Sequence, residues 1–414
     1  MSLFRNKWFI LFALLIPLNL LFGIDRNAMT VSAPYIQHEM GLDYVLMSEV
    51  LVISTAVYAL LQVPAGWLVQ RAGVKWVLIT ACLVWSGATI LASFQHTSNG
   101  LFGARILLGI GQAPDWVACI LALKLLFRES EREDTNAILL AGLYTGYIAS
   151  GTFTPYLVEN FGWRQSFFGY GIAGIVLAGI IFLCFQGPSR EVRPQEGKKD
   201  ETRARVWTGR VVTNVAQAAL FFGLACIMHS FFFVTFPHFA SSHFKVTPSG
   251  AGKLFSILWA ALYGSVLFWG ALIKYLRRKG KSEFLRSARG RVFAISLAAV
   301  FLAIGLYFDD TWVCMTFFAI SMAGLGLCQI LTWSYVQTIP GVTGMAAGFV
   351  QLAGNAGLAL GPVVFEILFR NYGVWIPVCY ISILCGIIGA LVWILPHVLT
   401  KGLKTDPLSA DGSM

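Results

Sequence analysis

Long apolar stretches alternate with short polar ones along the whole chain. A bilayer has a hydrocarbon core of roughly 30 Å, which a helix of about 20 apolar residues can span. Because lipid offers the backbone no hydrogen-bond partners, a spanning stretch has to be helical. We therefore expect an all-α membrane protein with twelve transmembrane helices, over residues 9–34, 45–69, 76–94, 101–127, 135–158, 166–187, 211–239, 248–273, 291–308, 311–336, 342–369 and 374–397.

Composition agrees with contact with a lipid bilayer. Of the 414 residues, 57% are hydrophobic and 12% are charged, about half the charged share of a soluble globule. The eight cysteines lack metal-ligand spacing, and the chain has no Walker loop, dinucleotide fingerprint, metalloprotease motif or nucleophile elbow. We therefore expect no enzyme activity, no cofactor, no metal and no disulfide.

Basic residues predict how the helices run through the membrane. If the N-terminus is cytoplasmic, 24 of the 30 lysines and arginines fall on the cytoplasmic side, and two, Arg26 and Arg105, lie inside apolar stretches. This asymmetry follows the positive-inside rule. We expect a multi-pass protein of the cell inner (plasma) membrane with both termini cytoplasmic. The net charge of +10 then reflects topology, and no nucleic-acid partner is expected. The four basic residues on the opposite side are Arg164, Lys245, Lys253 and Arg370.

One polar segment divides the twelve stretches into two sets of six. Residues 188–210 are rich in proline and charge and have no apolar face, which is typical of a linker. The predicted organisation is an N-terminal half at 1–187, a cytoplasmic linker at 188–210, a C-terminal half at 211–397 and a cytoplasmic tail at 398–414.

A glycine followed by basic residues recurs in both halves. The second stretch ends in Gly66-Trp-Leu-Val-Gln-Arg71-Ala-Gly73-Val-Lys75, and the eighth ends in Gly270-Ala-Leu-Ile-Lys274. The first of these segments resembles the loop signature of the major facilitator superfamily, in which Gly66, Arg71, Gly73 and Lys75 would form a gating loop. Two six-helix halves around a central site are also the layout of that superfamily.

Further segments are similar to one branch of the superfamily, the anion:cation symporters. Residues 105–113 resemble the fourth-helix motif of the superfamily. The segments that resemble the symporter branch are Asp25-Arg26 with Ala33-Pro34, Tyr58-x3-Gln62-x-Pro64-x-Gly66-Trp67, Phe161-Gly162-Trp163-Arg164 and Gly354-Asn355-x-Gly357-x3-Gly361-Pro362. The resemblance implies transport of organic anions, typically carboxylates such as sugar acids, usually with protons. It also implies that the chain works as a monomer.

Two positions depart from the pattern that the resemblance implies. The loop signature usually has an acidic residue where this chain has Gln70, which weakens an expected gating contact. The fourth helix usually has a glutamate, assigned to proton coupling, where this chain has Gln112. Glutamine does not titrate, so another group has to carry a coupled proton.

The two arginines inside apolar stretches are the first candidates for substrate binding. Charge at membrane depth is costly and is usually functional. Arg26 offers a planar fork of donors that suits a carboxylate, and the resemblance makes it a substrate contact. The alternative is an internal salt bridge. Arg105 and Gln112 are seven residues apart on nearly one helix face, and we expect both to bind substrate, with Arg26 and Arg105 forming one anion-selective centre. The resemblance places Arg105 in the charge network of the site.

Three titratable residues are candidates for proton coupling. Asp25 comes first, because it adjoins Arg26 in sequence but points about 100° away around the helix. Asp115 either replaces the missing glutamate or neutralises Arg105. His229 is a third candidate, and its alternative role is an interhelical hydrogen bond.

The remaining candidates rest mainly on the resemblance. Tyr58 and Asn355 match cavity-facing family positions, and Thr332 and Trp333 fall where family members contact substrate from the tenth helix. Each has a structural alternative in helix packing. We expect the run Phe231-Phe232-Phe233 to pack or face lipid, and Glu366 to be solvated.

The sequence thus predicts a proton-coupled symporter of an organic anion that works by alternating access. Two alternatives remain open. One is an amino-acid or other zwitterion transporter or exporter, in which Arg26 binds a carboxylate and Asp115 an amine. The other is a transporter-like sensor that binds a ligand without moving it.

Overall fold

The computed structural model describes residues 6–185, 209–281, 283–336 and 343–402. Within these ranges every regular element is a helix, which confirms the predicted fold class. The N-terminal elements are α1 (Lys7–Phe9), η2 (Ile10–Leu15), α2 (Ile16–Met40), α3 (Tyr44–Ala72), α4 (Val74–Ser93), α5 (Ser98–Leu126), α6 (Glu129–Phe161) and α7 (Trp163–Cys184). The C-terminal elements are α8 (Gly209–Ser230), η4 (Phe231–Thr235), α9 (Phe236–His243), α10 (Pro248–Arg278), α11 (Glu283–Arg286), α12 (Ala288–Gly305), α13 (Thr311–Val336), α14 (Thr343–Tyr372) and α15 (Pro377–Gly402).

Each of the twelve predicted stretches corresponds to one helical run. Eleven runs in the described residues are long and apolar enough to cross a membrane, and α1, η2 and α2 form one of them, as do α8, η4 and α9. The twelfth run, α6, has 33 residues, but threonine, serine, glycine and tyrosine dilute its apolar residues. Residues 188–208 of the predicted linker and 403–414 of the predicted tail lie outside the described residues, so both stay predictions. The first five residues of the predicted tail, 398–402, continue the helix α15.

A hydrogen-bonded clamp holds three N-terminal helices together at one end. The Trp163 indole N–H donates to Glu39 Oε2 at 2.6 Å, and an Arg164 guanidinium nitrogen lies 2.9 Å from Glu39 Oε1. Arg164 also donates to the backbone carbonyls of Ser93 and Gln95. Trp163 and Arg164 belong to one of the segments that resemble the symporter branch, and their contacts connect α2, α4 and α7.

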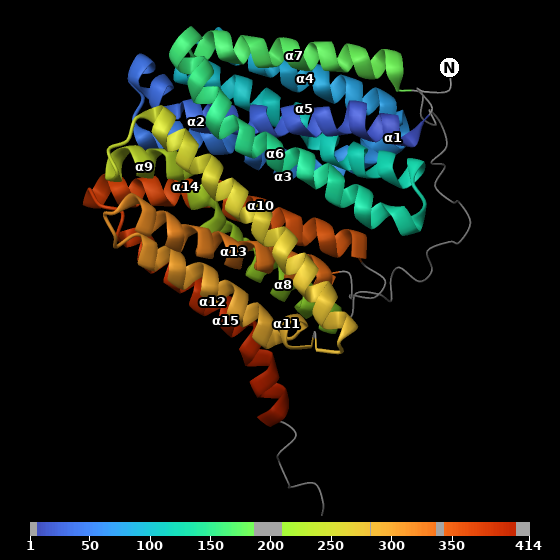
Figure 1. The fold of residues 1–414 in the computed structure, drawn as a ribbon, viewed down its shortest axis with the longest axis vertical. Coiled ribbons are helices and arrows are strands. Elements are labelled where there is room, and N and C mark those ends of the chain that lie inside the picture. The colour runs from blue at the N-terminus through green and yellow to red at the C-terminus, as the bar shows by residue number, and fades with distance from the viewer. Residues whose placement is uncertain (1–5, 186–208, 282, 337–342, 403–414) are drawn as a thin grey trace, which may run out of the picture.

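The two halves meet along α3 with α14 and along α6 with α10. In Figure 1 they converge near α9 and spread apart toward α11 and the start of α1. Ser256 of α10 donates to the Ile148 carbonyl of α6 at 2.7 Å, and its hydroxyl lies 3.0 Å from that of Thr152. Close to these bonds, Gly151 and Gly252 bring the two backbones together. We call this end of the molecule, where the halves meet, the closed end.

The Gly151–Gly252 crossing yields a testable prediction. A Cβ at Gly252 would lie 2.6 Å from Pro155 Cγ and closer still to the Gly151 carbonyl, so valine there cannot fit without moving α6 from α10. Overpacking of this kind costs about 1–3 kcal/mol, which shifts a conformational equilibrium by about fivefold to 150-fold. Gly252→Val should therefore reduce transport by at least about fivefold. Gly264→Val is the control, since a Cβ at Gly264 meets no atom within 4 Å. Uptake into proteoliposomes measures both, and equal loss in the two variants would contradict the prediction.

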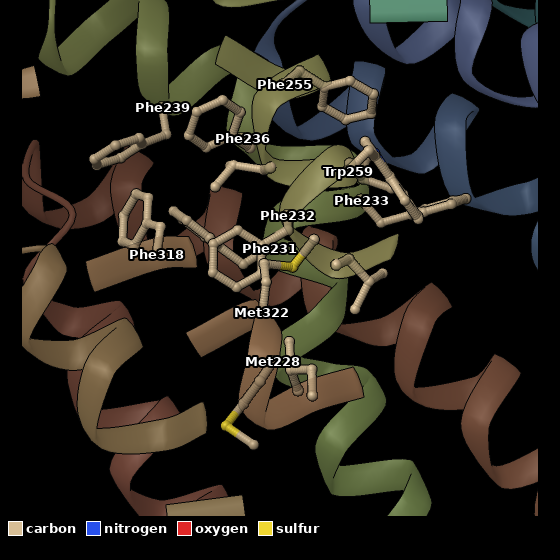
Figure 2. Packing of buried hydrophobic residues seen from close by; sticks show 14 of the residues in the cluster. Met228, Phe231, Phe232, Phe233, Phe236, Phe239, Phe255, Trp259, Phe318 and Met322 are labelled. Atoms are coloured by element: carbon tan, nitrogen blue, oxygen red, sulfur yellow. The ribbon is translucent and has the colours of Figure 1, made fainter. Parts of the chain in front are cut away.

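An aromatic core fills the C-terminal half beside the interface (Figure 2). Phe231 and Phe232 are fully buried and pack on Phe318 of α13, as expected for packing residues. The five residues of η4 form a π-helical turn, which re-aims the side chains that follow it. Phe233 consequently points away from this core and toward the N-terminal half, next to Trp259 (Figure 2).

Candidate functional site

Arg26 lies in the middle of the first helical run, at the interface between the halves. Its guanidinium carbon is 4.6 Å from the ring centroid of Tyr58 on α3 and 5.9 Å from that of Phe233 on η4. The residue is only 8% exposed, and in the described part of the chain no carboxylate oxygen lies within 4.0 Å of it. Arg26 is thus a buried cation on aromatic rings, without an anionic partner among the residues that the structure describes.

Aromatic and polar groups from both halves surround this position. Tyr147 of α6 packs on Trp259 of α10 with centroids 4.5 Å apart, and His229 of α8 lies 5.6 Å from the same indole. The Tyr147 hydroxyl interacts electrostatically with the guanidinium of Arg26. The Trp259 Nε1 and His229 Nε2 atoms are buried and have no hydrogen-bond partner in the described residues. The interface therefore presents one cation and two unused polar nitrogens.

Asp25 faces the interior of the N-terminal half, as the helical spacing predicts. Its carboxylate accepts a hydrogen bond from the Thr89 hydroxyl at 2.7 Å and a longer one from the Gln112 amide at 3.4 Å. Its charge also interacts with that of Arg105. Asp25, Thr89 and Arg105 line a cavity of about 10 Å³, roughly the space that one water molecule needs. Asp25 therefore lines a small, mostly apolar cavity that does not include the rings next to Arg26.

Arg105 lines the cavity of Asp25, and Gln112 donates to the Asp25 carboxylate. Arg105 is 4% exposed, and it donates to the Leu51 carbonyl of α3 at 3.0 Å while its Nε has no partner in the described residues. Gln112 is 2% exposed, and its amide is turned to Asp25. The structure therefore brings Arg105, Gln112 and Asp25 together and leaves Arg26 on the aromatic side of α2.

Asp115 is a further buried carboxylate of the N-terminal half. It is 1% exposed, and its Oδ1 atom has no hydrogen-bond partner in the described residues. The groups that its charge reaches include Cys82 and Cys119. No ion pair joins it to Arg105 within the described ranges. Asp115 is thus a second buried carboxylate, with fewer polar contacts than Asp25.

The contacts of Thr332 and Trp333 lie within the C-terminal half. Thr332 donates to the Cys328 carbonyl of its own helix at 2.8 Å, and Trp333 packs on Phe222 of α8. Asn355 is 2% exposed, and its Nδ2 has no partner in the described residues. Their roles in substrate binding stay predictions.

The predicted gating loop connects α3 to α4. Gly73 ends one helix and begins the next with φ +84°, a backbone conformation that favours glycine. Arg71 lies over the Trp67 ring, Lys75 lies over the Phe182 ring of α7, and Gly66 has open space at its Cβ position. The side chain of Gln70 lies outside the described residues. The gating role stays a prediction.

One expectation from the sequence is wrong. Glu366 is not solvated: it is 3% exposed, and its Oε2 atom lies 2.7 Å from Nδ1 of His238 on α9. The sequence position near the end of α14 suggested water, but α3 and α9 cover this end. The pair joins residues 128 positions apart, so nothing in the local sequence indicates it.

Sequence reasoning also missed Tyr147 and Trp259. From a single sequence, an aromatic residue on an apolar helix is interpreted as a packing residue, whether it faces the core or a binding site. Their only sequence signal is a polar end on an apolar ring, which is not specific.

With this geometry established, comparison with known proteins decides the family. The model described as Major Facilitator Superfamily matches residues 15–362. The chain belongs to the Major Facilitator Superfamily. It is therefore a multi-pass membrane transporter and not an enzyme.

Similar curated proteins in the superfamily carry transporter names. The chain is 25% identical to the probable galactarate/D-glucarate transporter GudP of Bacillus subtilis (strain 168), over 89% of this chain and 86% of that protein. It is 26% identical to the D-galactonate transporter of Escherichia coli O6:H1 (strain CFT073), over 90% of this chain and 91% of that protein. These similarities confirm the resemblance to the anion:cation symporter branch.

A solved structure of the superfamily shares the fold. The bacterial homologue of the human lysosomal transporter Spinster, in an inward-facing and occupied conformation, superimposes with a TM-score of 0.76. The match covers 94% of this chain and 96% of that one at 15% sequence identity. It supports the twelve-helix, two-half architecture.

Proposed function

We propose that this chain is a secondary active transporter of a small organic anion of the sugar-acid type. It would move the anion together with protons by alternating access, in which two rigid halves rock about a site between them. Relatives named for galactarate, D-glucarate and D-galactonate support this substrate class. All three compounds combine carboxylate with several hydroxyl groups.

The observation that carries the proposal is the buried guanidinium of Arg26, which forms no ion pair with a carboxylate of the described residues. A buried arginine without an anion is costly, so its function is expected to supply one. In the proposed complex the substrate carboxylate binds Arg26, while Trp259 Nε1 and His229 Nε2 hydrogen-bond to hydroxyl groups. The Tyr58 and Phe233 rings hold the guanidinium in place before the anion arrives.

Asp25 is the proposed carrier of the coupled proton. It is the carboxylate adjacent to Arg26 in sequence, and its contacts come from α4 and α5 of the same half. Protonating Asp25 as the anion binds to Arg26 would keep the net charge of the buried site unchanged. Arg105 is proposed to position this carboxylate from the pocket and not to touch the substrate.

The proposed orientation places the closed end outside the cytoplasm. With both termini cytoplasmic, as the basic residues predict, the contacts of α6 with α10 lie on the outer side. The structure would then represent the inward-open conformation of the transporter. Thiol labelling of cysteines placed at Thr97 and at Lys279, on opposite ends, tests this orientation in intact cells.

A thermal-shift screen tests the substrate class. A ligand at a hundred times its dissociation constant stabilises the folded state by about 2.7 kcal/mol, which raises the melting temperature of the purified carrier. We expect aldonates and aldarates to raise it, and amino acids and inorganic phosphate not to. A response to amino acids alone would instead establish the zwitterion alternative. Stabilisation by a sugar acid that proteoliposomes do not take up would establish a sensor.

A further inference from the structure

A second arginine lies buried on aromatic rings, in the C-terminal half. The Arg291 guanidinium carbon, on α12, is 4.4 Å from the ring centroid of Tyr335 on α13 and 4.2 Å from that of Trp393 on α15. The residue is 7% exposed, and no carboxylate oxygen of the described residues lies within 4.0 Å of its guanidinium. Arg291 thus repeats the arrangement of Arg26, but with rings from one half only.

Two hydrogen-bond donors at this position are unused. Arg291 Nε and Trp393 Nε1 are both buried, and neither has a partner in the described residues. The indole is itself held in place, because its ring lies edge-on to Tyr335, with centroids 5.0 Å apart, and to Phe221 of α8, with centroids 5.9 Å apart. A buried donor without an acceptor costs free energy, and a buried cation without an anion costs more. One negatively charged acceptor would satisfy both.

The chain next to Arg291 is strongly basic. Residues 274–291 contain eight lysines and arginines and one acidic residue. Lys279, Lys281 and Arg289 of this segment are exposed. The segment includes α11, which lies at the end of the bundle opposite the closed end (Figure 1). Basic clusters beside transmembrane helices attract the anionic headgroups of lipids.

The two outer helices of the site also expose apolar side chains. Phe293 and Val300 of α12 are exposed, and so are Leu391 and Ile394 of α15. In a transmembrane bundle, exposed apolar side chains on outer helices contact lipid acyl chains. A molecule that combines an anion with acyl chains therefore matches these surroundings better than a soluble anion does.

We propose that Arg291 and Trp393 bind the phosphate of an anionic phospholipid whose acyl chains lie against α12 and α15. The phosphate accepts hydrogen bonds from the Arg291 guanidinium and from Trp393 Nε1, while the Tyr335 ring holds the guanidinium in place. With both termini cytoplasmic, as proposed above, this lipid belongs to the cytoplasmic leaflet. None of these residues belongs to the proposed substrate site, so the inference does not rest on the transport reaction.

Native mass spectrometry of the delipidated carrier in detergent tests the ligand class, because each bound lipid adds its own mass. Dioleoylphosphatidylglycerol has the phosphate and the acyl chains, dioleoylglycerol has the same chains without phosphate, and glycerol phosphate has no chains. We expect the first lipid to bind at least about tenfold more tightly than either of the other two compounds. Equal binding of dioleoylglycerol would overturn the role of the phosphate. Equal binding of glycerol phosphate would overturn the lipid as the ligand.

Substitutions test the site itself. Arg291→Gln removes the charged donor and should weaken phosphatidylglycerol binding by at least about tenfold. Trp393→Phe keeps an aromatic ring but removes the indole N–H, so it should weaken binding by about threefold or more. The control is Arg289→Gln, which removes an exposed charge of the same helix and should change the affinity by less than about threefold.

The melting temperature without lipid shows whether each variant folds. Equal loss of affinity in Arg291→Gln and Arg289→Gln would show attraction to the basic segment alone and would overturn the site. Unchanged affinity in Arg291→Gln would also overturn it. If Arg291→Gln does not fold, Trp393→Phe decides, and an unchanged affinity in that variant would overturn the site in the same way.

Discussion

Replacing Arg26 with alanine is expected to abolish sugar-acid binding and uptake while leaving the fold intact. Hydrogen bonds to a charged group contribute about 1.5–3 kcal/mol each, so losing a two-pronged contact should weaken binding by at least about a hundredfold. Arg26→Lys keeps the charge but loses the planar fork, and we expect it to retain only a fraction of the affinity. Binding by thermal shift and uptake by proteoliposomes are the two measurements.

The control for this prediction is an arginine outside the interface. Arg278 is exposed at the end of α10, so Arg278→Ala should bind and transport like the unmodified protein. The Arg26→Ala variant should also keep its ligand-free melting temperature to within a few degrees, because it removes a buried cation that forms no ion pair within the described ranges. Undiminished sugar-acid binding by Arg26→Ala would show that the site lies elsewhere.

Replacing Asp25 with asparagine is expected to uncouple transport from the proton gradient. Asparagine keeps the shape of the side chain and can still accept from Thr89, but it cannot carry a proton. One proton moving down a gradient of one pH unit supplies about 1.4 kcal/mol, enough to concentrate a co-transported monoanion about tenfold. In Asp25→Asn the accumulation ratio should fall from about ten to about one.

Exchange of labelled for unlabelled substrate separates coupling from binding. Exchange requires no net proton movement, so Asp25→Asn should retain it. Asp115→Asn is the matched control, because Asp115 is an equally buried carboxylate without the contacts to Thr89 and Gln112. We expect it to accumulate substrate normally. Accumulation by Asp25→Asn together with failure of Asp115→Asn would transfer the coupling role to Asp115.

Periodicity and motif order were enough to predict the architecture. Each apolar stretch became a helix because backbone hydrogen bonding in lipid allows nothing else, and this constraint is local to the segment. Helix geometry also predicted that Asp25 and Arg26 face different surroundings, since neighbours on a helix point in different directions. It could not predict that Arg26 and Arg105 face different surroundings, because the rotation of α2 and α5 about their axes depends on how they pack on other helices.

The pairing of His238 with Glu366 is a second feature that the sequence alone could not predict. Glu366 lies near a helix end, which in sequence indicates contact with water, yet α3 and α9 bury it. The unpartnered nitrogens of Trp259 and His229 are equally invisible in sequence, since each residue type is common in a packed core.

The sequence by itself therefore determined the helices, their number and the ionisable residues among them, because hydrophobic length and backbone hydrogen bonding act within each segment. Only the tertiary structure decided which of those residues meet across the halves. Arg26 faces aromatic rings from α3 and η4, Arg105 lines the same cavity as Asp25, and the His238 ring stacks on that of Tyr44. These contacts depend on the rotation and crossing of helices far apart in the chain, which the order of residues along any one helix does not specify.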